Sequence, residues 1–234
     1  MKLRIKFKKQ GPVRFIGHLD VMRFFQKAIR RADIDVVYSS GYSPHQIMSF
    51  AAPLGVGLES SGEYMDIEVN SVTNSQDMIN RLNAAGVPGI EIVAVRELPN
   101  NAANAMASVA AAAYTVIFRE GREPRFDYIK ELDSFIKQES ILIKKETKKG
   151  IREVDLKPGI YQLSADKEGI HMLVDASSAG NIKPVKLIEA YLELHQESLQ
   201  ENALCINREE TYTNIGTADE PQLVPLDDIG EDIV

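Results

Sequence analysis

The sequence contains no tryptophan and only one cysteine, Cys205, among its 234 residues. A single cysteine excludes a disulfide within the chain and an iron-sulfur cluster held by four thiolates of this chain alone. It fits a reducing compartment, where such a residue is usually a small buried apolar side chain. No apolar run approaches the roughly 20 residues that span a bilayer, and the first residues contain no apolar signal core. We therefore expect a cytoplasmic protein without a membrane segment.

Motifs that would identify an enzyme are also missing. The sequence has no glycine-rich phosphate loop, no nucleophile elbow and no dinucleotide fingerprint. Carboxylates such as Glu59, Glu63 and Asp66 are available beside the histidines, but they do not follow a familiar metal-ligand spacing. We expect no metal or cofactor of the chain's own, and motifs alone indicate no enzyme class.

The charge is distributed unevenly along the chain. Residues 1–31 contain ten basic residues and one acid, a net charge of +9, whereas the whole chain has a net charge of −7. Residues 32–234 must therefore carry −16. This division argues against a protein that is basic on all sides, but it allows one basic face.

Hydrophobic periodicity predicts the elements of the first half. Residues 2–9 alternate between apolar and basic side chains, which predicts a half-buried strand with a basic exposed face. Residues 18–32 have apolar residues at helical spacing, which predicts a helix with one buried face. The basic residues of this helix gather on the opposite side: Arg23, Lys27, Arg30 and Arg31. Further strands are predicted near 36–38, 63–69 and 89–98, and a further helix at 78–86.

These elements follow the order strand, helix, strand, strand, helix, strand, which is the ferredoxin-like order. The same order is predicted again from strands at 114–118, 141–146, 159–165 and 169–176 and helices at 126–138 and 185–196, with a last strand near 203–206. We therefore expect an α+β protein with two ferredoxin-like (βαββαβ) domains in tandem, at residues 1–98 and 114–206.

Two segments lie outside these predicted domains. Residues 99–113 are rich in alanine and are predicted to be a linker, which the alanines could make helical. Residues 207–234 contain eight acids and one base, and this composition predicts a disordered acidic tail. The alternative is that residues 223–226 dock a partner.

The basic N-terminal region is the candidate nucleic-acid interface. Arginine and lysine bind phosphates, and exposed aromatic rings stack on unpaired bases. The candidate residues are Arg14, Phe15, Arg23, Lys27, Arg30, Arg31 and Tyr42, with Lys148 and Lys149 at the tip of a predicted hairpin. The competing interpretation is a solvated helix face balanced by the acidic remainder of the chain.

Two histidines are candidate catalytic residues. His45 follows Pro44 in a loop rich in serine and glycine, where an imidazole is available for acid-base chemistry. His18 lies toward the apolar side of the predicted helix, so capping or packing competes with a catalytic role.

Three stretches resemble the radical-SAM-linked proteins, a bacterial domain of unknown function encoded beside, or fused to, radical S-adenosylmethionine (SAM) proteins. They are GPVRFIGHLDVMRFFQKAIRRA, YSSGYSPHQIMSFAAPLGVGLESSGEYMDIEV and KKETKKGIREVDLKP. The resemblance implies a radical SAM protein as partner, with the iron-sulfur cluster and S-adenosylmethionine bound by that partner. It implies no demonstrated activity.

Together these observations favour an accessory protein of a radical SAM enzyme that binds RNA, or presents a substrate, through its basic N-terminal face. One alternative is a metal-independent RNA-processing or RNA-modifying enzyme that uses His45, with or without His18. The other is a pure protein-interaction adaptor.

Overall fold

A computed structural model describes residues 1–147, 150–217 and 220–234, and within these ranges the protein contains five α-helices and eleven strands. The chain divides into two compact units. Unit 1 comprises residues 1–110 and 208–234, and unit 2 comprises residues 111–207. Unit 1 is therefore built from both ends of the chain.

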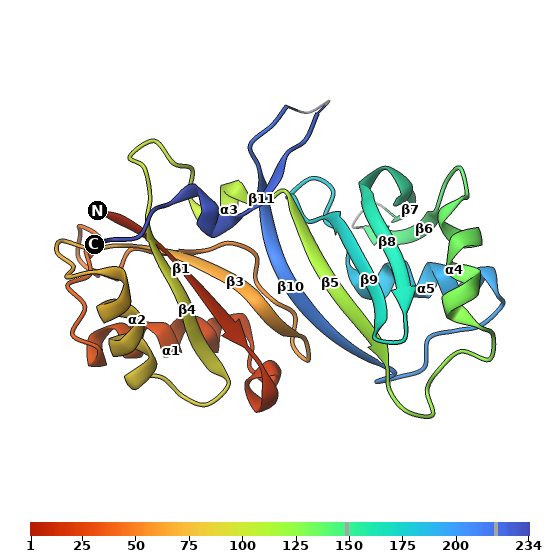
Figure 1. Ribbon diagram of the computed structural model, residues 1–234, viewed down its shortest axis with the longest axis horizontal. Coiled ribbons are helices and arrows are strands. Elements are labelled where there is room, and N and C mark those ends of the chain that lie inside the picture. Colours follow the sequence, from red (N-terminus) through yellow and green to blue (C-terminus); the bar gives the residue numbers. More distant parts are fainter. Residues whose placement is uncertain (148–149, 218–219) are drawn as a thin grey trace. The chain divides into compact units, whose positions relative to one another are not determined.

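Unit 1 combines an antiparallel sheet core with two long helices (Figure 1). Its elements are β1 (Lys2–Lys9), the 3-10 helix η1 (Gly11–Phe15), α1 (His18–Arg31), β2 (Met48–Phe50), β3 (Glu59–Glu68), α2 (Ser75–Ala84), β4 (Ile90–Glu97), the short α3 (Ala105–Ser108), β11 (Leu223–Pro225) and the 3-10 helix η3 (Leu226–Ile229). β10 (Leu204–Asn214) begins in unit 2 and ends in unit 1. The strand order is β4-β1-β3-β10, with β2 paired to β3 and β11 paired to β10.

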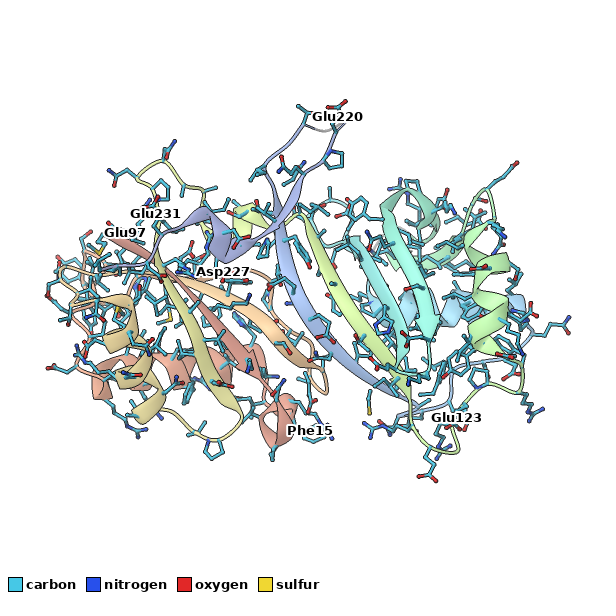
Figure 2. The ribbon with its side chains drawn as sticks, in the orientation of Figure 1. Phe15, Glu97, Glu123, Glu220, Asp227 and Glu231 are labelled. Carbon is cyan, nitrogen blue, oxygen red and sulfur yellow. The ribbon has the colours of Figure 1, made fainter. Side chains whose placement is uncertain are left out.

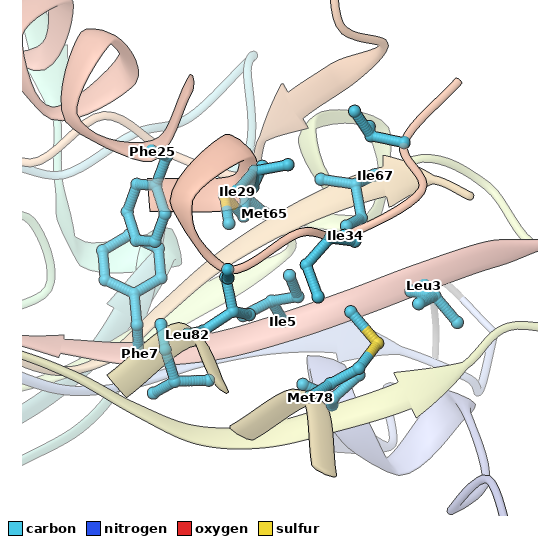
Figure 3. Packing of buried hydrophobic residues seen from close by; sticks show 14 of the residues in the cluster. Leu3, Ile5, Phe7, Phe25, Ile29, Ile34, Met65, Ile67, Met78 and Leu82 are labelled. Atoms are coloured by element: carbon cyan, nitrogen blue, oxygen red, sulfur yellow. The ribbon is translucent and has the colours of Figure 1, made fainter. Parts of the chain in front are cut away.

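The core of unit 1 lies on one face of this sheet, because alternate residues of a strand point to the same face. Leu3, Ile5 and Phe7 of β1 are buried, and they pack with Phe25 of α1 and Met78 of α2 (Figure 3). Both helices therefore cover the same face of the sheet. The Phe7 and Phe25 rings meet edge to face at a centroid distance of 4.7 Å.

Unit 2 contains two sheets. Its elements are β5 (Ala111–Phe118), α4 (Tyr128–Ile136), β6 (Leu142–Thr147), β7 (Gly150–Asp155), the 3-10 helix η2 (Lys157–Gly159), β8 (Ile160–Asp166), β9 (Gly169–Asp175) and α5 (Pro184–Leu194). β9 pairs antiparallel with both β5 and β8, and β6 pairs with β7 in a separate two-stranded sheet. β6 lies at the predicted strand 141–146, and with β7 it forms the predicted hairpin. These two strands exceed a βαββαβ order, so the tandem ferredoxin-like arrangement is not confirmed and stays a prediction.

The prediction of a disordered tail at 207–234 is wrong. These residues form most of β10, all of β11 and η3, and the side chain of Leu226 has no exposed area. The predicted linker at 99–113, which the alanines could make helical, contains α3 and the first residues of β5, and Ala105 is buried. The prediction of a disordered tail failed because it weighed composition alone, and composition does not show which distant residues a segment meets.

None of the helices in the described ranges is both long enough and apolar enough to cross a membrane.

Candidate nucleic-acid interface

Helix α1 has the two faces that its sequence predicted. Val21, Phe25, Ala28 and Ile29 are buried against the sheet. The basic residues Arg23, Lys27, Arg30 and Arg31 are all exposed. At 3.6 residues per turn, residues 23, 27 and 30 follow one another along the same side of the helix. We call the four exposed residues the α1 stripe.

Few contacts neutralise the α1 stripe. Arg23 forms an ion pair with Asp20 at 3.2 Å, and both side chains are more than 60% exposed. Such exposed pairs contribute little energy, so Asp20 competes weakly with an incoming phosphate. Arg30 Nε donates to the Gln26 carbonyl at 3.2 Å. Within the described ranges, no carboxylate forms an ion pair with Lys27, Arg30 or Arg31.

Arg14 and Phe15 lie on η1, the turn that follows β1 (Figure 2). The Arg14 guanidinium contacts Glu59 at 3.1 Å and lies over the Phe15 ring at 4.9 Å from its centroid. Phe15 is 62% exposed. Arg14 is thus partly committed to Glu59, whereas the Phe15 ring is open to a stacking partner.

The loop that carries Tyr42 and His45 is closed by Ser39. The Ser39 hydroxyl accepts a hydrogen bond from the His45 backbone N–H at 3.1 Å and lies 2.9 Å from His45 Nδ1. Because the hydroxyl oxygen accepts from the backbone, its own hydrogen is available to donate to Nδ1, and this assignment leaves Nε2 directed away from Ser39. Both His45 and Tyr42 are exposed.

His18 lies in different surroundings from His45. Its ring meets Phe50 edge to face at 5.1 Å, and it lines a hollow with Lys9, Val21 and Glu63. His45 lines another hollow, with Gln26 and Arg30 among its neighbours. The two histidines therefore do not share a site, and His18 has the packing contacts that compete with a catalytic role.

The remaining candidates concern the hairpin and metal binding. Lys148 and Lys149 lie outside the described residues. Lys144 and Lys145 of β6 and Arg152 of β7, which flank them, are all exposed. Among the residues that the structure describes, no group of three or more His, Cys, Asp or Glu side chains could hold a metal ion.

The predicted basic face of β1 is exposed only at Lys2, and this is a correction: Arg4 is buried, and Lys6 and Lys8 are half-buried. Arg4 has no exposed area; its Nε and Nη2 contact Asp66 at 2.8 and 2.9 Å, and its Nη1 donates to the Leu226 carbonyl at 3.1 Å. Lys6 contacts Glu210 and Asp227. Acids of the C-terminal segment therefore neutralise Lys6, and Asp66 of β3 neutralises Arg4, so neither basic residue is available to a nucleic acid.

Tyr64 joins Lys6, Glu210 and Asp227 in a cluster that the sequence did not predict. Its hydroxyl lies 2.7 Å from Glu210 Oε1 and 2.6 Å from Asp227 Oδ1 (Figure 2 labels Asp227). Burial and the two carboxylates raise the pKa of Tyr64. Burial alone would lower the pKa of Lys6, but Glu210 and Asp227 outweigh it and raise that pKa. The only sequence signal was the opposite charge of the two chain ends.

A third group of charges lies at the end of the unit 1 core. Lys9 follows Phe7 by two residues, so its side chain lies on the same face of β1 as Phe7, and Lys9 is only 2% exposed. Its Nζ donates to the Arg14 carbonyl at 3.1 Å. Burial lowers the pKa of Lys9, and the negative charge of nearby Glu63 opposes this shift. Burial raises the pKa of Glu63, and Arg208 opposes that shift through an ion pair in which Nη1 lies 2.8 Å from Glu63 Oε1. These groups hold unit 1 together and face its interior.

Comparison with known proteins gives a family and no activity. The sequence model of the family DUF2344, described as an uncharacterized protein conserved in bacteria, matches residues 2–184. A search of curated proteins found no match.

Proposed function

Because this chain belongs to the DUF2344 family of uncharacterized bacterial proteins, whose description includes no activity, we propose a function from the site: the protein binds RNA through the α1 stripe and assists a radical SAM enzyme. The observation that carries the RNA proposal is the exposure of four basic residues along one helix, whereas Arg4, Lys6 and Lys8 of β1 are paired with acids. The basic charge that remains for a partner in this part of unit 1 is thus concentrated on α1.

Phosphate binding follows from the geometry of the stripe. Arg23 and Arg31 are eight residues apart, which corresponds to about 12 Å of helix. Each phosphate that a lysine or arginine neutralises releases counterions, so binding weakens with salt, with a slope of about 0.7 per contact for a single strand. Three or four contacts would give a steep and measurable salt dependence.

The role beside a radical SAM enzyme rests on the sequence resemblance and on the cysteine content. With Cys205 as the single cysteine, the chain cannot supply four thiolates to a cluster. In this proposal the partner holds the iron-sulfur cluster and S-adenosylmethionine, and the present chain presents RNA to it.

We also propose that unit 1 has ferredoxin-like topology. The pairing of β4 with β1 and of β1 with β3, together with β2 on β3 and both helices on one face, supports this assignment. In unit 2 the hairpin β6–β7 would then be an addition to a second copy of the same plan.

The test is RNA binding over a salt series with Arg23→Glu/Lys27→Glu beside the wild type. The matched control is Lys167→Glu/Lys183→Glu, which makes the same change in net charge at exposed positions of unit 2. We expect wild type and control to bind total cellular RNA with the same salt slope, and the α1 variant to lose about two contacts from that slope. Circular dichroism checks that both variants are folded.

Three outcomes separate the candidate functions. No binding of the wild type at low salt, or equal losses in the two variants, contradicts the RNA proposal. Salt-sensitive binding to a protein partner and not to RNA favours the adaptor. A second candidate, an RNA-processing or RNA-modifying enzyme, is favoured by the orientation of His45 by Ser39; it predicts that His45→Ala abolishes turnover of bound RNA while binding persists.

A further inference from the structure

A hollow of about 180 Å³ lies beside the α1 stripe, between α1 and residues 38–46. It is lined by Gln26, Arg30, Tyr38, Pro44, His45 and Gln46. The backbone holds the two sides of the loop together, since Ser39 N–H donates to the His45 carbonyl at 2.8 Å and Ile47 N–H to the Val37 carbonyl at 2.9 Å. Gln46 Nε2 donates to the Gln26 carbonyl at 3.3 Å, which fixes the loop to the helix.

The side chains around this hollow are of the types that read an unpaired base. Tyr38 is 47% exposed and offers an aromatic face, and His45 and Arg30 offer an imidazole and a guanidinium plane. Proteins that recognise single-stranded RNA stack its bases on such groups and bind the base edges through hydrogen bonds. An exposed helix face without such a hollow would bind phosphates and would not distinguish a paired base from an unpaired one.

Gln46 gives a second and independent indication. The residue is 5% exposed, and its side-chain Oε1 is buried without a hydrogen-bond partner among the described residues. A buried acceptor without a partner is unfavourable, and native proteins contain few of them. A donor on a ligand that enters the hollow, such as the exocyclic amino group of a base, would satisfy this oxygen.

The hollow is continuous with the α1 stripe. Arg23, Gln26, Lys27 and Arg30 are spaced at i, i+3, i+4 and i+7, so they lie along one side of the helix. Gln26 and Arg30 of this series line the hollow, whereas Arg23 and Lys27 extend the positive charge beyond it. A strand whose phosphates follow the stripe would therefore pass the opening of the hollow.

We propose that this hollow binds one unpaired nucleobase, with Tyr38 as the stacking residue, so that the protein selects single-stranded RNA over duplex. The proposal rests on the RNA binding proposed above and adds the class of RNA that the same site takes. In this proposal the Tyr38 ring contacts the base directly, and the α1 stripe supplies the phosphate contacts.

The experiment measures fluorescence anisotropy of the full chain with a labelled single-stranded RNA of about 12 nucleotides and a duplex of the same length. The variants are Tyr38→Leu, which removes the aromatic face, and Tyr38→Phe, which retains it. Tyr161→Leu is the matched control, because Tyr161 lies on β8 in unit 2 and is 43% exposed.

We expect the wild type to prefer the single strand. Tyr38→Leu should bind the single strand about tenfold more weakly, the size expected for one stacked base, with less than about a twofold change for the duplex. The salt slope should stay unchanged, since no phosphate contact is lost, and Tyr38→Phe should restore wild-type affinity. The control should behave as the wild type.

Two results would overturn this inference while leaving RNA binding intact. One is that the wild type binds the single strand and the duplex with equal affinity and that Tyr38→Leu has the same affinities as the wild type. The other is loss of the single-strand preference in Tyr42→Leu and not in Tyr38→Leu, which would place the stacking at the fully exposed Tyr42 and outside the hollow. A wild type that binds neither RNA would overturn the proposed function as well.

Discussion

Arg4 lies in a strand of alternating basic and apolar residues, yet its side chain has no exposed area. Its guanidinium contacts Asp66 through two nitrogen atoms and donates to the carbonyls of Ala103 and Leu226. Burying a charge is costly unless it is paired and hydrogen-bonded, and these four contacts meet that requirement. One residue near the start of the chain thus fixes the positions of three distant segments.

Removing the carboxylate of this pair should be strongly destabilising. We expect Asp66→Ala to lower the free energy of unfolding by about 3–5 kcal/mol, because it leaves the Arg4 charge buried without a counter-ion. The control is Glu91→Ala. It breaks the exposed ion pair between Glu91 of β4 and Lys8, which lies on the same strand as Arg4, and it should lower the free energy of unfolding by less than about 1 kcal/mol. Urea titration measures both, and equal losses would contradict the role assigned to Arg4.

At the scale of the element, the sequence indicated helices α1 and α2 because the signals that define them are local, although α2 begins at Ser75, three residues before the predicted 78–86. α2 begins after Asn74, whose side-chain oxygen accepts from the Asp77 N–H at 2.8 Å. α1 follows Gly17, which provides no side-chain cap, so its amphipathic pattern and its packing define it. In contrast, the three-residue β2 is too short to give a periodic signal.

The cap of α2 provides a test at this scale. We expect Asn74→Ala to destabilise unit 1 by about 1 kcal/mol, because the first turn loses a hydrogen-bond acceptor. Asn80→Ala makes the same substitution at an exposed position inside the same helix, where alanine has the better propensity, so stability should be unchanged or slightly higher. Thermal unfolding followed by circular dichroism compares them; a loss for Asn80→Ala as large as that for Asn74→Ala would contradict the capping role.

For the whole molecule, the charge distribution was visible in the sequence but its consequence was not. A net charge of +9 in residues 1–31 and eight acids against one base in residues 207–234 suggested a basic face and a free acidic tail. In the structure, part of the basic N-terminal region pairs with part of the acidic C-terminal segment, because Lys6 forms ion pairs with Glu210 and Asp227. These partners are more than 200 residues apart in the sequence, and local sequence patterns do not predict contacts at such a separation. The α1 residues of the candidate site were predictable because they lie within one helix, whereas the hollow beside them depends on how a loop packs.

The C-terminal segment should therefore contribute to the stability of unit 1. We expect Leu226→Ala to cost about 2–5 kcal/mol, the range for removing a fully buried leucine side chain. Leu194→Ala, at a position 46% exposed at the end of α5, is the control and should cost much less. Equal stability of Leu226→Ala and the wild type in urea would show that the segment lies on unit 1 without supporting it.

Unit 1 comprises residues 1–110 and 208–234, so during synthesis it cannot be completed until the second of these segments has been made. Glu210 and Asp227, which neutralise Lys6, are synthesised more than 200 residues after it. At about 5–20 residues per second, this interval is roughly 10–45 s. During that interval all of unit 2 is synthesised, and Lys6 of β1 still lacks both of its carboxylate partners. The newly made chain is thus more basic in its exposed surface than the finished protein, and a chaperone or an RNA near the ribosome would meet a charge that the folded molecule later covers.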